Sequence, residues 1–309
     1  MALSTRPFAD ALLRHFVSLL ALLGPAGRWR VCRCLAPLVL LLAHSTRRRL
    51  IQHLHLAFPA MGRSARTRLA LRSYARVCMG VLDSLFLKEL RVDIAYEDAG
   101  ARQALTQGER ACVSTLHMGC YETVALALQR LTGRCTTLAK LPPGLPSIAT
   151  RLRASGIRYL DRTEGNQLFE LVAALRKGGF VCLHADHQGR DIEVRFLGQT
   201  TKAPVGCALV AALGGAPLLL GHAQMLAAGH YRVSFSTLST QAPGRDLASL
   251  KRQVRRCYRR FDALVRAHPE HYYWSYARFR PRAEPQAGPP QSKPAAFSQE
   301  PVRSWRGAL

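Results

Sequence analysis

Lysine and paired cysteines are scarce in this 309-residue chain. It holds 38 arginines but only six lysines, and its nine cysteines are scattered, mostly inside apolar runs. No CxxC pair recurs at the spacing of a zinc site, and Cys32 and Cys34 stand too close together for a usual one. The cysteines therefore indicate reduced, buried thiols in a cytosolic environment.

Long uninterrupted apolar runs are also missing. Residues 8–23 and 31–43 are apolar, but Asp10 and Arg14 interrupt the first segment and Pro37 interrupts the second. Neither reaches the ~20 uninterrupted apolar residues that a spanning helix needs, and the charges also argue against a signal peptide. Eight arginines and a single acid in the first 50 residues favour an interfacial anchor on an anionic leaflet. A pair of buried core helices is the alternative.

The net charge is unusual, at +25 with an isoelectric point near 10.8. Part of the arginine excess can reflect a GC-rich genome, so it is weak evidence for nucleic-acid binding. The charge favours anionic partners such as lipid head groups, phosphate-bearing carriers or polynucleotides. No recognition fold or aromatic stacking platform stands out, which disfavours a nucleic-acid-binding protein.

Short apolar runs alternate with helical patterns along most of the chain, and no internal repeat appears. A long amphipathic helix is expected before residue 90. Strands are predicted at 111–116, 156–162, 180–184, 216–221 and 231–238, the last near a sheet edge, and helices at 122–131, after Asn166, at 203–213 and at 246–267. The pattern predicts an α/β fold with a mixed, mostly parallel central sheet flanked by helices and preceded by membrane-associated N-terminal helices. The sheet is expected to begin near residue 110.

The stretch STLHMGCYETVALAL, residues 114–128, carries the candidate chemistry. Within one continuous helix, His117 and Glu122 would point about 140° apart. If the helix instead begins after His117, Gly119 supplies the turn and Glu122 can reach back to the ring from the first helical turn. A carboxylate that fixes the tautomer leaves the other ring nitrogen free to take a proton from a hydroxyl. Backbone N–H groups at the helix N-terminus can stabilise an oxyanion nearby.

The pair alone leaves other interpretations open. Glu122 is also consistent with an ordinary helix start, where it serves the helix dipole. A metal site of His117, Cys120 and Glu122 is disfavoured because no second ligand cluster stands out.

Three further segments follow His117 and Glu122 in order: GIRYLDR (156–162), LRKGGFVCLHADHQGRD (175–191) and GAPLLLG (215–221). Together the four resemble the ordered motifs of the glycerolipid acyltransferase superfamily. Within it, the chain particularly resembles the bacterial lipid A biosynthesis (late) acyltransferases. That likeness is carried by HLHLAFPAMGRSARTRLALRSYA, HMGCYE, ADHQGRDIEVRFLG and YYWSYARFRPR, and it covers roughly residues 5–282.

The resemblance implies roles for particular residues. His117 would act as the general base, and Glu122 would orient its ring. Arg153 or Arg162, together with Asp186, would line the site, where an arginine pairs a phosphate of the acceptor or of the donor's phosphopantetheine arm. Trp274, Arg278 and Phe279 are candidates for clamping the C-terminus onto the core, and Arg278 is also a candidate for meeting a head group. No metal or redox cofactor is implied.

Several positions depart from the family's pattern. Its Asn-Trp pair is Cys120-Tyr121 here, its Asp-Gln turn is Asp186-His187, and its Phe-Phe-Gly segment is residues 196–198, Phe-Leu-Gly. His184 and His187, which flank the turn, are interpreted as exposed turn histidines, and a second catalytic histidine is the alternative. These departures leave the acceptor open beyond lipid A itself: another glycolipid, or a lipid with a polyene or aromatic head group, is the alternative.

The sequence therefore predicts an O-acyltransferase on the cytoplasmic face of the inner membrane. Its donor would be acyl carrier protein or acyl-CoA, and its acceptor a lipid or glycolipid hydroxyl at the membrane surface, with no nucleic acid involved. The expected organisation is a membrane-associated helical segment (1–50), an acyltransferase domain (51–282) and a disordered Pro-rich tail (283–309). A catalytically inactive lipid-binding scaffold of the same fold is the main rival, and a basic nucleic-acid-binding protein is the weaker one.

Overall fold

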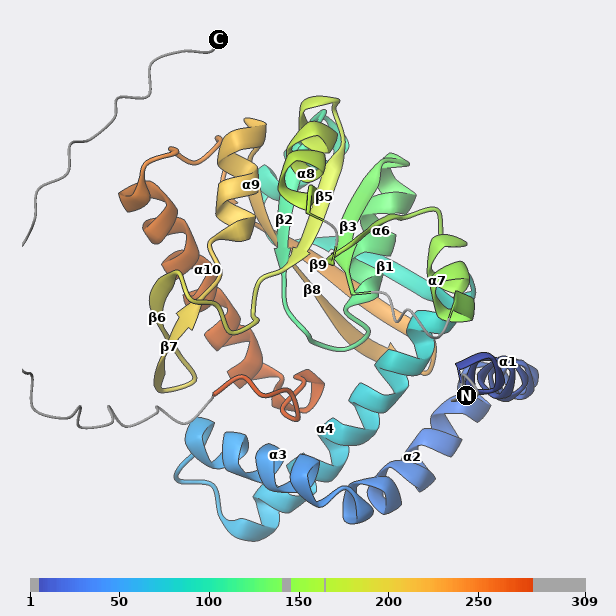
Figure 1. Ribbon diagram of the computed structural model, residues 1–309. Coiled ribbons are helices and arrows are strands. Elements are labelled where there is room, and N and C mark those ends of the chain that lie inside the picture. Colours follow the sequence, from blue (N-terminus) through green and yellow to red (C-terminus); the bar gives the residue numbers. More distant parts are fainter. Residues whose placement is uncertain (1–5, 141–145, 164, 280–309) are drawn as a thin grey trace, which may run out of the picture. The chain divides into compact units, whose positions relative to one another are not determined.

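Seven strands form the central sheet of the computed structural model, which describes residues 6–140, 146–163 and 165–279. Their order is β1-β9-β8-β2-β5-β3-β4 (Figure 1), and all neighbours are parallel except β8 and β9. The strands are β1 (Arg91–Tyr96), β2 (Ala111–Thr115), β3 (Cys135–Ala139), β4 (Arg158–Asp161), β5 (Phe180–His184), β8 (Leu218–Ala227) and β9 (His230–Ser239). The mixed, mostly parallel α/β sheet predicted from the sequence is confirmed.

The helices cover both faces of this sheet because its central strands are apolar on both sides. Leu218 and Leu220 of β8 belong to the core beneath α8, α9 and α10, whereas Leu219 belongs to the core beneath α5, α6 and α7. These helices are α5 (Ala99–Thr106), α6 (Glu122–Thr132), α7 (Pro146–Arg153), α8 (Gln167–Arg176), α9 (Gly206–Gly214) and α10 (Leu247–Ala267). Asp246 caps α10 by accepting a hydrogen bond from the backbone N–H of Ser249, as its sequence predicts.

The sheet extends further than predicted. Strand β1 begins at Arg91, not near residue 110, and it pairs with the first part of β9, from His230 to Phe235. The predicted edge strand is therefore an interior strand, and its Val233 and Phe235 are fully buried. The residues of β1 are only partly buried, so its apolar alternation was weak. The helix expected from residue 203 begins at Gly206, because β7 (Gln199–Ala203) pairs with β6 (Ile192–Phe196) in a separate hairpin.

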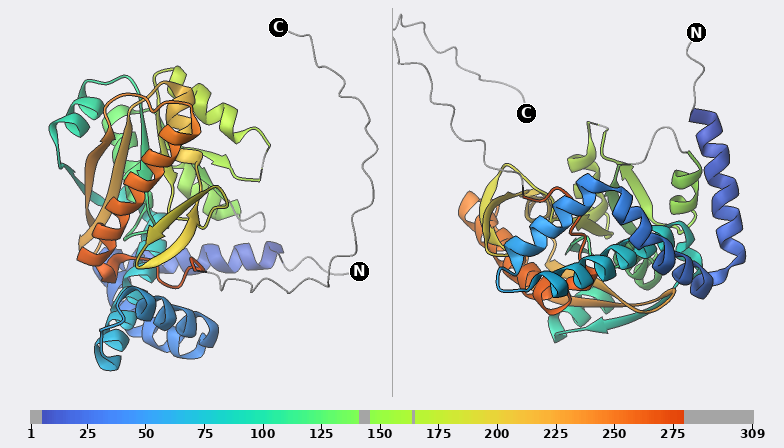
Figure 2. Two further views of the ribbon diagram at one scale, coloured as in Figure 1. Left: turned by 90° about the vertical axis from the view of Figure 1, so that its left-hand side faces the viewer. Right: turned by 90° about the horizontal axis from the view of Figure 1, so that it is seen from below.

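Four N-terminal helices precede the sheet: α1 (Arg6–Leu22), α2 (Gly24–Leu42), α3 (His44–Ala57) and α4 (Arg63–Asp83). Helix α4 continues into the 3-10 helix η1 (Ser84–Glu89) and lies against the carboxyl ends of the central strands (Figures 1 and 2). A Cβ atom placed on Gly80 of α4 would lie 2.5 Å from the carbonyl oxygen of Gly119, so the helix and the loop after β2 are in direct contact.

Helices α1 and α2 pack against the protein through only part of their surface. Each buries a few side chains, including Val17, Leu20, Ala36 and Leu40, while a row of large apolar residues stays exposed. The exposed ones are Leu12, Phe16, Leu19, Leu22, Leu23, Leu35, Leu38, Val39, Leu41 and Leu42. Among the helices of the described ranges, none combines the length and the apolar character needed to cross a membrane. The predicted tail at 283–309 lies outside the described residues, and the division at residue 50 stays a prediction.

Candidate active site

The loop that carries His117 connects β2 to α6 at the carboxyl edge of the sheet. Helix α6 begins at Glu122, as predicted, so the histidine lies outside it. Gly119 turns the chain with a φ of +60°, and a Cβ atom there would lie 2.9 Å from the carbonyl oxygen of Ala223. Glycine is therefore needed at this position for both its backbone conformation and its lack of a side chain.

The C-terminal segment after α10 fixes this loop in place. The backbone N–H of Gly119 donates to the carbonyl of His271 (2.9 Å), and the N–H of Tyr273 donates to the carbonyl of His117 (3.1 Å). A β-bridge joins Met118 to Tyr272. The segment itself is anchored by Trp274, which is 1 % exposed and packs against Phe58 of the N-terminal region. Chain regions far apart in sequence thus hold the histidine rigidly.

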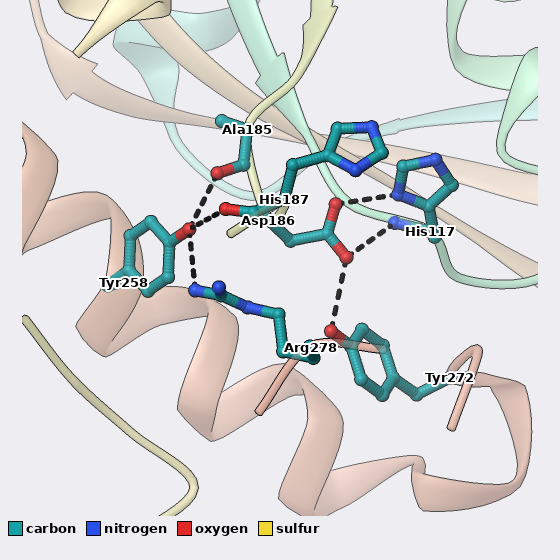
Figure 3. A network of polar contacts seen from close by, with 7 residues as sticks. All are labelled: His117, Ala185, Asp186, His187, Tyr258, Tyr272 and Arg278. Atoms are coloured by element: carbon teal, nitrogen blue, oxygen red, sulfur yellow. Dashed lines mark hydrogen bonds and ion pairs between the residues drawn. The ribbon is translucent and has the colours of Figure 1, made fainter. Parts of the chain in front are cut away.

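The ring of His117 pairs with Asp186. Its Nδ1 atom lies 2.7 Å from Oδ1 of the carboxylate, while Oδ2 accepts from the backbone N–H of His117 (3.2 Å) and from the hydroxyl of Tyr272 (3.1 Å) (Figure 3). The parallel register explains the meeting, since Thr115 of β2 stands beside His184 of β5. Two residues beyond each partner come His117 and Asp186.

Asp186 is suited to remain ionised. Its side chain is almost fully buried, and burial by itself would raise its pKa. The charge of His117 and the hydrogen bond to the ring outweigh burial, with smaller contributions from His187 and Arg278, and hold the pKa well below its usual range. Hydrogen-bonded to an ionised carboxylate, Nδ1 carries the ring proton, and Nε2 is left free to accept another.

Glu122 does not hold the ring as the sequence predicted. Its carboxylate accepts a hydrogen bond from the Tyr159 hydroxyl at 3.2 Å, and the hydrogen-bond partner of His117 is Asp186. Glu122 lies in the first turn of a helix that leads away from the loop, so its side chain points toward β4, where Tyr159 stands. Burial raises the pKa of Glu122, while Tyr159 and the charge of His117 partly offset that increase.

Aromatic rings surround His117 on several sides. The ring centroids of Tyr121, His184 and His187 lie 4.6, 4.7 and 4.5 Å from its own, and Tyr276 stacks on it at 6.1 Å. The two neighbouring histidines were expected to be exposed, yet both are partly buried. Burial lowers the pKa of His184 well below its usual value and that of His187 to about 4. Both rings are therefore neutral at physiological pH.

A pocket of about 480 Å³ opens beside His117. The residues that line it come from η1, β3, α6, α7, β5, α9 and the loops at the carboxyl edge: Ser84, His117, Tyr121, Glu122, Leu138, Ala139, Lys140, Ile148, Leu152, Arg162, Leu183, His184, Ala185, His187, Gln188, Pro204, Gly206 and Cys207. Aliphatic side chains form much of its wall, and two cations, Lys140 and Arg162, are among the exposed residues. The pocket thus combines a candidate base, an apolar wall and positive charge.

The predicted arginines fall in three different places. Arg162 lines the pocket, whereas Arg153 is exposed at the end of α7 and does not line it. Arg278, a candidate for meeting a head group, is instead 1 % exposed, because it packs between the rings of Phe196 and Tyr258. Its Nη2 donates to the Tyr258 hydroxyl (2.9 Å), which in turn lies 2.7 Å from the carbonyl of Ala185 and 3.2 Å from that of His187 (Figure 3). Arg278 and Tyr258 therefore brace the backbone on both sides of Asp186.

Sequence reasoning placed Asp186 in the site but missed its partnership with His117. The signal that could have found it is the equal distance of the two residues from the ends of two adjacent parallel strands. Tyr272 and Tyr258 were also missed, because their contacts depend on how the C-terminal segment and α10 fold back over the site. Among the described residues, no group of three or more His, Cys, Asp and Glu side chains is arranged to hold a metal ion.

Comparison with known proteins gives a family for this chain. No curated protein sequence matches it at a significant level. The chain does match the family model of the bacterial lipid A biosynthesis acyltransferases over residues 2–281, which is nearly its whole length. The resemblance of the sequence motifs is thereby confirmed, and the chain belongs to the bacterial lipid A biosynthesis acyltransferase family.

Proposed function

We propose that this acyltransferase moves a fatty acyl chain from the thioester of acyl carrier protein or coenzyme A to a hydroxyl of a lipid A-like or other glycolipid acceptor. Family membership supports acyl transfer in general. The observation that carries the proposal is the His117–Asp186 pair, whose 2.7 Å contact orients a ring that lines a partly apolar pocket. Such a pocket suits an acyl chain next to a base.

The proposed reaction is a direct transfer. With Nδ1 donating to Asp186, Nε2 of His117 accepts the proton of the acceptor hydroxyl as the oxygen attacks the thioester carbonyl. The new carbon–oxygen bond forms a tetrahedral oxyanion, and its collapse breaks the carbon–sulfur bond. The thiolate leaves and receives the proton from His117. Asp186 stabilises the imidazolium between these two proton transfers.

The carboxylate that lines the pocket, Glu122, suits a different task from that of Asp186. Burial raises the pKa of Glu122, whereas His117 holds the pKa of Asp186 low, so the two pKa values are shifted in opposite directions. Pairs of carboxyls separated in this way commonly divide acid and base roles. A protonated Glu122 would supply a hydrogen bond to the developing oxyanion, and Tyr159 would hold its side chain in place.

Positive charge at the pocket suits the phosphates of the proposed substrates. Lys140 and Arg162 are exposed at its lining, where a guanidinium can bind a phosphate of the acceptor or of the donor's pantetheine arm in a bidentate way. The net charge of +25 would also steer an acidic carrier protein toward the enzyme. Turnover with carrier protein should therefore fall as salt is raised, and turnover that is indifferent to ionic strength would contradict this part of the proposal.

The proposed location is the cytoplasmic face of the inner membrane. The exposed leucine rows of α1 and α2 and the arginines beside them suit helices that lie in an anionic interface. A lipid acceptor would reach the pocket from the same surface.

The decisive experiment replaces His117 by alanine. Lipids from cells that carry no copy of the gene, the natural gene or H117A are compared by mass spectrometry. The proposal expects an acylated species that appears only with the natural gene, while H117A remains folded and membrane-bound. A variant that restores this species would instead support an inactive lipid-binding scaffold.

A further inference from the structure

A second and larger cavity lies between the N-terminal helices. It measures about 990 Å³ and is lined by fourteen residues of α2, α3, α4 and their connections: Pro37, Leu40, Leu41, His44, Arg47, Arg48, Ile51, Gln52, His55, Arg63, Arg66, Thr67, Ala70 and Leu71. None of these residues lines the pocket at His117. We refer to this cavity as the α2–α4 groove.

The lining of the groove is partly apolar and strongly cationic. Six of its lining residues are aliphatic or proline, while four are arginines and two are histidines, and none is acidic. Residues 11–82 contain no Asp or Glu at all. None of the four lining arginines forms an ion pair with an acid of the described chain, so their charge is uncompensated. The favoured ligand is therefore both anionic and apolar.

The four arginines form two pairs, one fixed by hydrogen bonds and one free. Arg47 donates to the carbonyl of Leu41 (2.7 Å) and contacts the ring of His44 (2.8 Å), and Arg66 donates to the carbonyl of Met61 (2.6 Å), so both are fixed in the wall. Arg48 and Arg63 are exposed, and their side chains make no hydrogen bond within the part of the chain that the structure describes. These two guanidiniums are free to bind a phosphate.

The groove opens onto an apolar surface. Leu41 lines it while 60 % exposed, and Leu38 and Leu42 on the same helix are 57 % and 79 % exposed. An acidic protein docked on the arginines would leave these leucines beside it in water. A lipid in a bilayer would cover them with its neighbours' chains, so continuity with this surface favours a membrane lipid.

We propose that the α2–α4 groove binds one acidic phospholipid of the membrane, with its phosphate between Arg48 and Arg63 and an acyl chain along Leu40, Ile51 and Leu71. This lipid is a ligand, not a substrate. It would fix the depth and orientation of the N-terminal helices at the interface, and the site is separate from the proposed catalytic pocket.

The test compares two double variants that remove the same charge from the protein. R48Q/R63Q removes the free arginines of the groove, and R68Q/R72Q removes two exposed arginines of α4 that do not line it. Partition onto vesicles of phosphatidylglycerol in phosphatidylcholine should fall about 30-fold for the first pair, from ~1 kcal/mol for each arginine. For the control pair we expect at most about a threefold fall.

Native mass spectrometry of the whole protein with phosphatidylglycerol tests the stoichiometry. We expect one retained lipid, which is lost in R48Q/R63Q and in T67W, a variant that fills the groove without changing charge. Circular dichroism checks that each variant is folded. Three results would each overturn the proposal. They are an equal fall in vesicle partition for the two double variants, partition of the natural protein onto pure phosphatidylcholine vesicles that equals its partition onto phosphatidylglycerol-containing ones, and a T67W protein that keeps its lipid. Binding of an acidic carrier protein to the groove in place of the lipid would also overturn it. None of these readouts requires acyl transfer, so they are independent of the proposed activity.

Discussion

Replacement of Asp186 by asparagine tests the geometry of the site most directly. The side chain keeps its shape, and an amide oxygen in the position of Oδ2 can still accept from the Tyr272 hydroxyl and from the backbone N–H of His117. The amide nitrogen then faces Nδ1 of the ring, where Oδ1 stands 2.7 Å away in the natural protein. Because an amide N–H donates, the ring must accept at Nδ1 and carry its proton on Nε2. That is the wrong tautomer for a base.

The expected loss follows from the function of the base. A positioned general base contributes roughly 10²–10⁴ in rate, which corresponds to ~3–5 kcal/mol of transition-state stabilisation. D186N favours the tautomer that is protonated on Nε2 and lacks the negative charge that stabilises the imidazolium, so its kcat should fall by about this whole factor. KM should change little, because Asp186 is buried beneath the pocket and does not line it. The assay is acyl transfer by the purified variants, followed by mass spectrometry of the product.

Two controls make the result interpretable. D161N changes an aspartate that caps Thr163 outside the pocket, and its activity should remain that of the natural protein. E122Q keeps the hydrogen bond from Tyr159, and its amide N–H can still donate to the oxyanion, so it should retain most of kcat, whereas E122A removes that donor and should reduce kcat without affecting the tautomer of His117. If D186N stays within about threefold of the natural kcat while H117A is inactive, Asp186 does not orient the base and the proposed mechanism is wrong.

Three other substitutions have clear expected outcomes. G119A should lower both the melting temperature and kcat, because it combines a left-handed φ with a close backbone carbonyl, whereas G133A has a φ of +68° but open space around it and pays only the ~1–2 kcal/mol backbone cost. H187Q should reduce the loss of stability as pH falls from 6.5 toward 4, by at most about 3 kcal/mol in urea titrations, since the natural imidazole has a folded-state pKa of about 4 and must charge on unfolding. Burial raises the folded-state pKa of Asp83 to about 6, so the stability of the natural protein falls as the pH rises from 4 to 6. The free energy of unfolding of D83N should therefore rise relative to that of the natural protein across this range, by up to about 3 kcal/mol, and the difference should stay constant above it. If the difference in unfolding free energy between H187Q or D83N and the natural protein does not change across these pH ranges, the side chain titrates alike in the folded and unfolded chains.

Local patterns predicted most of the elements that build the site. Helix α6 begins at Glu122 because Gly119 turns the backbone just before it. Helix α10 begins after Asp246 because the Asp246 carboxylate caps the helix. Strands β2 and β5 are short, mostly apolar runs bounded by polar turns, which made them easy to recognise. What these elements share is that their signals lie within about ten residues of sequence.

The missed features depend on contacts between distant segments. Strand β1 was missed because its stability comes from pairing with β9, some 139 residues later, and its own side chains are only half-buried. The sequence left Arg278 open between a clamp on the C-terminus and a contact to a head group, and only the folded core, where Phe196 and Tyr258 enclose it, favours the first. Neither outcome is encoded in a local pattern.

The identity of the histidine's partner shows how a sheet can override a motif. Glu122 is five residues from His117 in sequence, but a helix start separates the two, and the first turn of α6 directs the carboxylate toward Tyr159. Asp186 is 69 residues away, yet parallel pairing of β2 with β5 places the two residues at equal distances beyond their strands. Residues that follow adjacent parallel strands by the same number of positions meet at the carboxyl edge regardless of their separation in sequence. In an α/β chain, an acid at the matching offset on the neighbouring strand is therefore a better candidate for orienting a histidine than an acid nearby in the same motif.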